Sequence, residues 1–237
     1  MKLLITICAR GGSKGIPGKN IRLINGIPLI AYSISHAQQF AKMHNADITI
    51  STDSQDIKDV AENYGIKSDY SRPESISLDR TGKIETIKHV LNFEEHFRNK
   101  RYDYLLDLDV TSPLRNLADL EKAFEIIQGD EEAVNLFSVN LANRNPYFNM
   151  VEQKDNGYFS LVKKGVFLSR QAAPIVFDLN ASFYFYRRAF FDMKIQSTIT
   201  DRSLVYQMPH VCFDLDHPID LEFMEYLLVN NKLGFTL

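Results

Sequence analysis

Short apolar runs alternate with amphipathic segments along the first 140 residues of the chain. The runs predicted as strands lie at residues 3–9, 47–53, 102–110 and 133–139. The segments predicted as helices lie at residues 28–41, 54–65, 82–97 and 116–128. This alternation predicts an α/β fold in which a mostly parallel sheet lies between helices.

The alternation of strands and helices stops after residue 140. Residues 140–169 are polar and aromatic, with short alternating stretches such as GYFSLV, and we expect them to form a β-rich arm inserted in a single domain of residues 1–237. A predicted strand at 181–188 and a predicted helix at 220–231 follow. Because a two-stranded ribbon cannot bury its own aromatic rings, we expect the arm to pack on a second copy in a two-fold homodimer.

Length and composition indicate a globular protein. The chain has 237 residues, 45% of them hydrophobic, which is enough to bury a full core. Its apolar runs are far shorter than the roughly 18 residues of a membrane span, and the first run continues into Arg10 without a small-residue cleavage site. We therefore expect a cytoplasmic protein without a membrane partner. Cys8 and Cys212 lie far apart in apolar runs and are expected to be reduced.

Charge is distributed unevenly, although the formal net charge is only -3. No acidic residue precedes Asp47, whereas six basic residues do, namely Lys2, Arg10, Lys14, Lys19, Arg22 and Lys42. A nucleic-acid-binding face would need many more cations spread over a surface. We therefore expect the first 46 residues to attract a compact polyanion and not a nucleic acid.

A glycine-rich, basic loop follows the first predicted strand, with the sequence CARGGSKGIPGKN at residues 8–20. In a parallel sheet, the loops at the carboxyl ends of the strands are where ligands bind. The loop fits neither G-x-x-x-x-G-K-[ST] nor G-x-G-x-x-G, which disfavours a P-loop kinase and a dinucleotide oxidoreductase. Its glycines let backbone N–H groups approach phosphate oxygens, and its cations add charge-assisted contacts. These features predict a polyphosphate site.

Six motifs, in order along the chain, resemble those of the acylneuraminate cytidylyltransferases, the CMP-sialic acid synthetases. They read ARGGSKGIPGKNI, NGIPLIAYSI, STD, SRPESISLD, TSPLR and FDLDHPIDLE. Any one of them is weak evidence, but six in this order over nearly the whole chain are specific. The resemblance implies a nucleotide-diphospho-sugar transferase-like fold. It also implies an enzyme that joins CTP to an acidic, nine-carbon-type α-keto sugar, giving the CMP-sugar and pyrophosphate.

The resemblance also implies which residues form the site. The catalytic residues would be Lys19, Arg10 and Asp216, with Lys19 the first choice. The nucleotide-binding residues would be Arg10, Gly11, Gly12, Ser13, Lys14, Lys19, Asn20, Arg72, Asp79 and Thr81. The substrate-binding residues would be Asp109, Thr111, Ser112, Arg115, Arg170, Gln171, Asn180 and Tyr184.

A metal site is predicted near the carboxyl end of the chain. Asp214 and Asp216 stand two residues apart in VCFDLD, and alternation along a strand would place both side chains on one face. Two such carboxylates repel each other unless each is solvated, protonated or bridged by a cation. Beside a triphosphate a hard divalent ion is the natural partner, so we expect Mg²⁺ as a cofactor. The alternative is that Asp216 begins a turn or caps the last helix, although Asp220 is better placed for that.

Two positions depart from the pattern of the resembled family. Leu108-Asp109-Val110 stands where that family commonly reads Leu-Gln-Pro, and Asn180-Ala181 stands where Asn-Gly is expected. A carboxylate at position 109 would repel an acidic sugar unless a cation or the metal lies between them. Asp109 could instead be a second metal ligand.

Two other functions remain open at the level of sequence. One is a related nucleotidyltransferase for another acceptor, such as a 3-deoxy sugar acid or a sugar phosphate. The other is a nucleotide-binding paralogue without catalytic turnover. Within the preferred function, the acceptor could be N-acetylneuraminate, a legionaminate, a pseudaminate or KDN, and the sequence does not choose among them.

Overall fold

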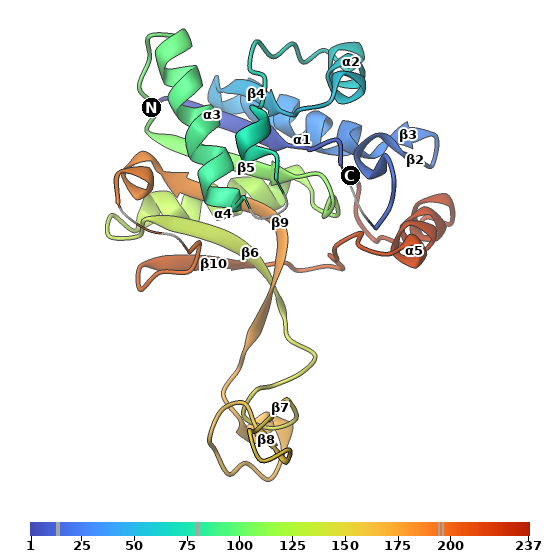
Figure 1. Ribbon diagram of the computed structural model, residues 1–237, viewed down its shortest axis with the longest axis vertical. Coiled ribbons are helices and arrows are strands. Elements are labelled where there is room, and N and C mark those ends of the chain that lie inside the picture. Colours follow the sequence, from blue (N-terminus) through green and yellow to red (C-terminus); the bar gives the residue numbers. More distant parts are fainter. Residues whose placement is uncertain (13–14, 79–80, 194, 196) are drawn as a thin grey trace.

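The fold is built on one six-stranded sheet (Figure 1). The computed structural model covers residues 1–237 and describes all of them except 13, 14, 79, 80, 194 and 196. In spatial order, the strands of the sheet are β10 (Ser203–Gln207), β6 (Asn135–Leu141), β9 (Phe177–Arg187), β5 (Tyr104–Asp109), β1 (Leu3–Cys8) and β4 (Asp47–Ser51).

Most neighbouring strands of the sheet are parallel. β1 pairs in parallel with β4 and with β5, and β10 pairs in parallel with β6, whereas β9 runs antiparallel between β5 and β6. In register, Cys8 lies opposite both Ser51 and Asp109, so three strands end side by side at one edge of the sheet. The predicted α/β class with a mostly parallel sheet is confirmed.

Helices cover both faces of the sheet. They are α1 (Leu29–His44), α2 (Gln55–Asn63), α3 (Lys83–Phe97), α4 (Leu117–Gly129) and α5 (Pro218–Val229). The first four match the predicted segments to within a few residues. Among the described residues, none of the helices combines the length and the apolar character that crossing a bilayer requires.

Two apolar cores lie on the opposite faces of the sheet. On one face, Phe40 of α1 and Phe124 of α4 have their ring centroids 5.9 Å and 5.1 Å from that of Phe185 in β9. On the other face, Ile87 and Leu91 of α3 lie in a cluster with the strand residues, fully or almost fully buried. Alternating side chains of β1, β5 and β9 therefore enter different cores, which is why these strands read as largely apolar runs.

One prediction about the last third of the chain is wrong, and one strand in it was missed. VCFDLD, at residues 211–216, is extended but belongs to no strand, and its Leu215 N–H donates to the backbone oxygen of Thr111 at 2.8 Å. β10 was not predicted, although it completes the sheet beside β6. Both segments are short and apolar, so their local patterns cannot reveal which one finds a partner strand.

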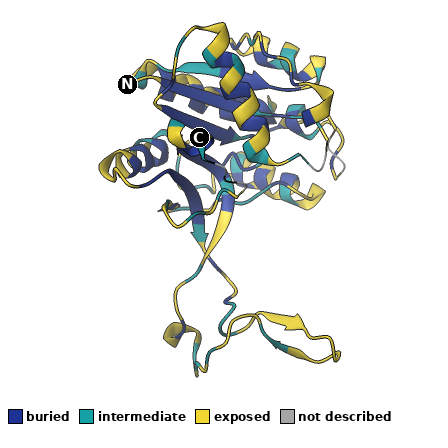
Figure 2. Cartoon of the chain, turned by 60° about the vertical axis from the view of Figure 1, so that its left-hand side comes forward, coloured by how far each residue is buried: buried dark blue, intermediate teal, exposed yellow. Residues whose placement is uncertain are grey.

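A β-rich arm projects from the sheet where β6 and β9 continue beyond it (Figure 1). Its tip contains a hairpin of β7 (Val151–Gln153) and β8 (Phe159–Leu161), inside the predicted bounds of 140–169. The arm also includes the residues that lead into β9. Most of the arm is exposed in this single copy, in contrast to the buried sheet (Figure 2). A second hairpin, β2 (Leu23–Ile24) with β3 (Ile27–Pro28), follows the glycine loop in the body.

Candidate active site

A polar pocket of about 290 Å³ lies at the edge where β1 and β5 end. It receives side chains from the glycine loop, from the segment between α2 and α3, from the start of α3 and from the end of β5. Its lining residues are Cys8, Arg10, Lys19, Asn20, Arg72, Thr81, Lys83, Thr86, Asp109 and Thr111. Seven of these ten residues were predicted from the sequence, and Cys8, Lys83 and Thr86 were not.

The glycine loop is fixed to its neighbours by backbone contacts. The N–H of Gly11 donates to Asp53 Oδ1 at 2.7 Å, and the side-chain amide of Asn20 donates to the backbone oxygen of Arg10 at 2.9 Å. A Cβ at position 11 would lie 2.9 Å from the Cβ of Ser54, so only glycine fits this close approach. Gly11 and Gly12 are exposed, which leaves this backbone accessible to a ligand.

Lys19 joins the glycine loop to a segment almost two hundred residues later. Its Nζ donates to the backbone oxygen of Leu215 at 2.8 Å and lies 3.4 Å from Oδ1 of Asp216. The side chain of Lys19 is only 13% exposed, whereas that of Asp216 is 66% exposed. Lys19 is thus held in place, while the carboxylate of Asp216 remains open to solvent and to a ligand.

Asp214 and Asp216 lie in a segment that forms no strand. Oδ1 of Asp214 is buried and has no hydrogen-bond partner among the described residues. Burial, followed by the negative charges of Asp109 and Asp216, raises the pKa of Asp214 to about 6. A cation beside this carboxylate would relieve both effects, so the oxygen donors present fit a hard divalent ion. Within the described part of the chain, no three His, Cys, Asp or Glu side chains form a complete metal site.

Asp220, not Asp216, caps the start of α5. Its Oδ2 accepts hydrogen bonds from the N–H groups of Asp216 and His217, at 2.9 Å and 2.7 Å. This contact satisfies backbone donors at the helix start, where an acidic side chain is favoured. The alternative that Asp216 caps the helix is therefore wrong, and the Asp216 carboxylate remains accessible to a ligand.

Arg72 is anchored beneath the pocket and not free on the surface. Its Nε donates to the hydroxyl of Ser51 at 3.0 Å and its Nη2 donates to the backbone oxygen of Ser51 at 2.8 Å. Only 9% of the residue is exposed. The loop that begins at Arg72 is thereby tied to the end of β4, and its Thr81 reaches the pocket.

Lys83, the first residue of α3, lies between two carboxylates at the end of β5. Its Nζ is 2.9 Å from Oδ2 of Asp109 and 3.1 Å from Oδ2 of Asp107, and it stands 4.2 Å from the ring centroid of Tyr184. Burial alone would lower the pKa of Lys83, but Asp109 and Asp107 outweigh burial and hold it well above its usual value. Burial would likewise raise the pKa of Asp109, but Lys83 more than compensates and lowers it.

The TSPLR segment is organised from within by Arg115. This guanidinium is fully buried and donates to the backbone oxygens of Ser112 at 2.9 Å, Ser182 at 2.7 Å and Asp109 at 3.1 Å. Burial lowers the pKa of Arg115 to about 10. Of the predicted substrate-binding residues of this segment, Asp109 and Thr111 line the pocket, whereas Ser112 and Arg115 lie behind it as supports.

Asn180 and Tyr184, both on β9, are also buried. The side-chain oxygen of Asn180 accepts from the hydroxyl of Ser138 at 2.5 Å, and its backbone oxygen accepts from the hydroxyl of Ser112 at 2.6 Å. Tyr184 lies beneath the ammonium group of Lys83. Both residues support the wall of the pocket and are not among its lining residues.

Arg170 and Gln171 lie on the arm, away from the pocket in this copy. They line a separate cavity of about 420 Å³ formed by arm residues, and Nη2 of Arg170 donates to the backbone oxygen of Ala142 at 2.6 Å. The remaining predicted residues, Ser13, Lys14 and Asp79, lie outside the described residues.

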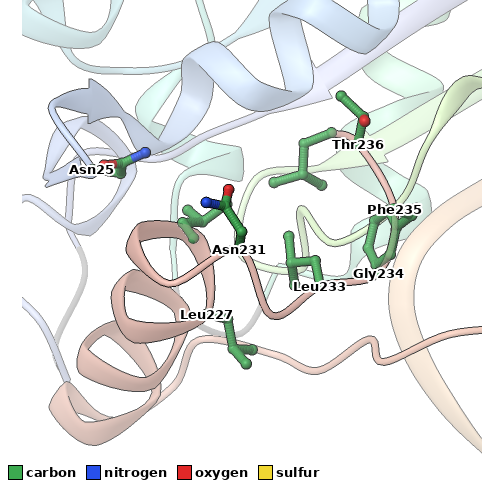
Figure 3. Close-up of a pocket in the computed structure, with 9 residues that line it drawn as sticks. Asn25, Leu227, Asn231, Leu233, Gly234, Phe235 and Thr236 are labelled. Carbon is green, nitrogen blue, oxygen red and sulfur yellow. The ribbon is translucent and has the colours of Figure 1, made fainter.

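A further cavity of about 470 Å³ lies between α5, the end of the chain and the β2–β3 turn (Figure 3). Its lining includes Asn25, Leu227, Leu233 and Phe235, and none of the nine described side chains around it is charged. Without a cation it offers nothing to neutralise a triphosphate. The smaller polar pocket is therefore the candidate active site.

A glycine loop and convergent cations at the carboxyl ends of parallel strands define a nucleotide-binding α/β protein. Residues 4–233 match the family described as cytidylyltransferase. The chain belongs to the cytidylyltransferase family, and the resemblance inferred from the six motifs is confirmed.

Several relatives match along the whole chain. A CMP-N,N'-diacetyllegionaminic acid synthase of Campylobacter jejuni is 39% identical over 98% of this chain and 97% of its own length. A post-translational flagellin modification protein B of Campylobacter coli is 37% identical over the same shares of the two chains. Among solved structures, a CMP-2-keto-3-deoxy-manno-octonic acid synthetase complexed with CTP has a TM-score of 0.70 at 18% identity, covering 98% of this chain and all of the other. This structural likeness supports the fold.

Proposed function

We propose that this protein transfers the cytidylyl group of CTP to a nonulosonic acid, a sialic-acid-like α-keto sugar, and releases pyrophosphate. The observation that carries the proposal is the meeting of Lys19 with Leu215 and Asp216 at the pocket edge. It brings a phosphate-binding loop and a candidate metal-binding segment to one place. Relatives at 31–39% identity that are named as synthases of this kind support the acceptor class.

In this proposal the chain acts mainly by holding the reactants and neutralising charge. The triphosphate lies on the backbone of the glycine loop, with Arg10 and Lys19 at its oxygens. The anomeric hydroxyl oxygen of the sugar bonds to the α-phosphorus and loses its proton to solvent water, while the bond from that phosphorus to the oxygen bridging to the β-phosphorus breaks. Pyrophosphate leaves with the electron pair. Lys19 stabilises the leaving group most as its charge grows, which lowers the barrier.

Asp214 and Asp216 are the side chains that would hold Mg²⁺ in the proposed enzyme. The ion would neutralise phosphate charge and lower the pKa of the attacking hydroxyl. Support comes from the buried Oδ1 of Asp214, which has no hydrogen-bond partner in the described part of the chain, and from the exposed carboxylate of Asp216. The predicted cytoplasmic location agrees with the use of CTP and remains a prediction.

We also propose that two copies associate through their arms and that Arg170 and Gln171 serve the acceptor site of the partner. In support, these two residues are remote from the pocket of their own chain. Apolar arm side chains such as Val166 and Leu168 are 93% and 97% exposed, an arrangement typical of a surface that another molecule covers.

The test of the proposed function is a pyrophosphate-release assay. CTP and each of the other three nucleoside triphosphates are supplied with N-acetylneuraminate, a legionaminate, a pseudaminate or a 3-deoxy octulosonate. We expect release with CTP and at least one nine-carbon acid. The proposal would be overturned if pyrophosphate were released only with the octulosonate. It would also be overturned if none of the four acceptors led to release.

A further inference from the structure

The pocket contains negative as well as positive side chains, although both of its proposed ligands are negatively charged. Arg10, Lys19 and Arg72 suit an anionic ligand, yet Asp109 lines the same pocket and Asp107 lies directly behind it. Both proposed substrates, CTP and an acidic sugar, are anions. Carboxylates fixed beside an anion weaken its binding unless a cation compensates them.

Both carboxylates are fixed and cannot turn away from the pocket. The other oxygen of Asp107 accepts from the hydroxyl of Thr6 at 2.7 Å, inside the sheet. The other oxygen of Asp109 accepts from the N–H and the hydroxyl of Thr111, at 2.8 Å and 2.9 Å. In each case the remaining oxygen faces Lys83.

Lys83 is the cation that meets them. Among the ion pairs of the described residues, Asp107 and Asp109 are each paired with Lys83 alone. Its side chain is 27% exposed and lines the pocket, so its charge is felt by a ligand there. A cation at the first residue of a helix is opposed by the helix dipole. The two carboxylates provide the physical reason for a lysine at this position.

We propose that Lys83 is the internal counter-ion of the pocket, a positioning residue whose single positive charge offsets part of the negative charge of Asp109 and Asp107 so that anionic substrates can bind beside them. The proposal rests on the proposed function for the identity of the ligands. In this arrangement Asp109 is committed to Lys83 and Thr111 and is not a ligand of the metal. Lys83 and Asp109 therefore act as one unit, and the loss of one changes what the other does.

The experiment is a double-mutant cycle on Lys83 and Asp109, read out by binding of CTP without metal and by kcat and KM with CTP. We expect Lys83→Met to weaken CTP binding by at least about tenfold, which is about 1.4 kcal/mol. Asp109→Asn in the Lys83→Met background should recover most of that loss, because the cluster regains the net charge it has in the original protein and Asp107 is the only carboxylate left in it. Lys83→Arg, which keeps the charge, should remain within a few-fold of the original protein.

A matched control lies on the same helix. Lys88 is exposed on α3, and Lys88→Met removes an equal charge outside the pocket, so CTP binding should not change. Unfolding midpoints of every variant separate loss of binding from loss of fold. If Lys83→Met does not fold, the comparison of the double variant with Asp109→Asn and with Lys83→Arg carries the test.

Two results would overturn the inference. One is CTP binding by folded Lys83→Met that equals that of the original protein. The other is a double variant that binds metal-free CTP as weakly as Lys83→Met or more weakly, which would show that Asp109 supports CTP binding by itself. The proposed function would instead be contradicted if the original protein bound CTP but released no pyrophosphate with any acceptor. In that case the double-mutant cycle on CTP binding would still decide the role of Lys83.

Discussion

The pocket edge of the body and the tip of the arm depart from the usual distribution of residues in opposite ways. At the pocket edge, charged groups are buried, with Asp107 fully enclosed and Lys83 beside it. On the arm, apolar groups are exposed, with Tyr158 76% and Ile175 75% accessible. Buried charge and exposed apolar surface both cost stability unless a partner compensates them. The comparison indicates that the edge is shaped for a small charged ligand and the arm for another protein surface.

The largest expected effect comes from removing a proposed metal ligand at the pocket edge. Asp216→Asn should reduce CMP-sugar formation by about a hundredfold or more, because the variant loses a carboxylate that would hold Mg²⁺ near the reacting phosphate. Binding of CTP without metal should change little. The measurements are pyrophosphate release at limiting Mg²⁺ and a metal-free CTP titration.

The control for this variant is Glu222→Gln, an exposed acid one turn into α5. It should turn over at the original rate. If Asp216→Asn also did so at limiting Mg²⁺, Asp216 would not be a metal ligand.

The next effect tests whether the arm completes the site of a partner. Lys19→Ala should lower turnover by at least about tenfold, and Arg170→Ala should also be impaired. When the two variants are mixed and allowed to exchange subunits, each mixed dimer regains one site with an intact Lys19 and an intact partner arm. At random pairing about a quarter of the sites recover, so activity should rise to about a quarter of the original.

Light scattering gives the companion measurement for the arm. We expect the mass of a dimer at micromolar concentration, and Leu168→Asp should shift it toward a monomer, since a charge on a covered apolar surface is costly. A monomeric original protein would contradict the association. A dimer whose mixed variants show no recovery would instead place Arg170 in the site of its own chain.

A smaller effect concerns a buried pair between Asp119 of α4 and His210, neither of which lines the pocket. Nε2 of His210 lies 2.8 Å from Oδ2 of Asp119, and the two side chains are 13% and 3% exposed. Burial alone would lower the pKa of His210, but Asp119 outweighs it and raises the pKa. The same contact holds the pKa of Asp119 below its usual range, against the effect of burial.

The sign of the pH dependence follows from these two shifts. The contribution of His210 is fully present below its unfolded pKa of about 6.5 and is lost as pH rises through its higher folded value. The contribution of Asp119 is lost only as pH falls through its own lowered value. Relative to His210→Gln, the original protein should be about 2 kcal/mol more stable to urea near pH 5.5. That gap should narrow toward pH 8.5, and an unchanged gap would refute the charge pair.

Turnover in His210→Gln should be unchanged at a temperature where the variant is folded. This outcome would show that the buried pair of His210 and Asp119 supports the fold alone. The buried charges at the pocket edge, in contrast, are expected to affect ligand binding.

The smallest effect is a gain of stability at the junction of arm and sheet. Ala181 has a φ of 56°, in the left-handed region that favours glycine, and it follows the buried Asn180. Ala181→Gly should raise the free energy of unfolding by about 0.5–1 kcal/mol, since relief of the strained conformation exceeds the entropy that glycine loses. Ala118→Gly on the exposed face of α4 should instead destabilise by about 1 kcal/mol. Thermal unfolding of both variants checks the pair.

Most of the fold could be predicted from the sequence because its elements carry strong local patterns. The strand ending at Cys8 is continuously apolar, and α1 shows helical spacing as far as Asn45, where the backbone turns left-handed. The errors lie at 203–216, where β10 pairs with β6 and residues 211–216 form no strand. Which segment pairs is decided by tertiary contacts such as that between Leu215 and Thr111, and no local pattern contains them.

The site could be predicted where a motif supplies several cations close together, as in the glycine loop. Lys83 was missed because its partners are 24 and 26 residues away in sequence and it resembles an ordinary helix residue. Two signals could have found it. One is a cation at the start of a helix, where the dipole disfavours it, and the other is Asp107 with Asp109, spaced to share one face at the end of a strand.

The continuity of β9 joins the arm to the pocket mechanically. Its first residues, Phe177–Leu179, pair with the end of β6 in the arm, and further along it Ser182 donates through its hydroxyl to the backbone oxygen of Ser112 at 2.7 Å. A pull on the arm along this strand would load the hydrogen-bond ladder in shear, the direction in which many bonds must break together. The load would reach the support of the TSPLR segment through a single unbroken backbone, so an arm held by a second molecule would also brace the wall of the pocket.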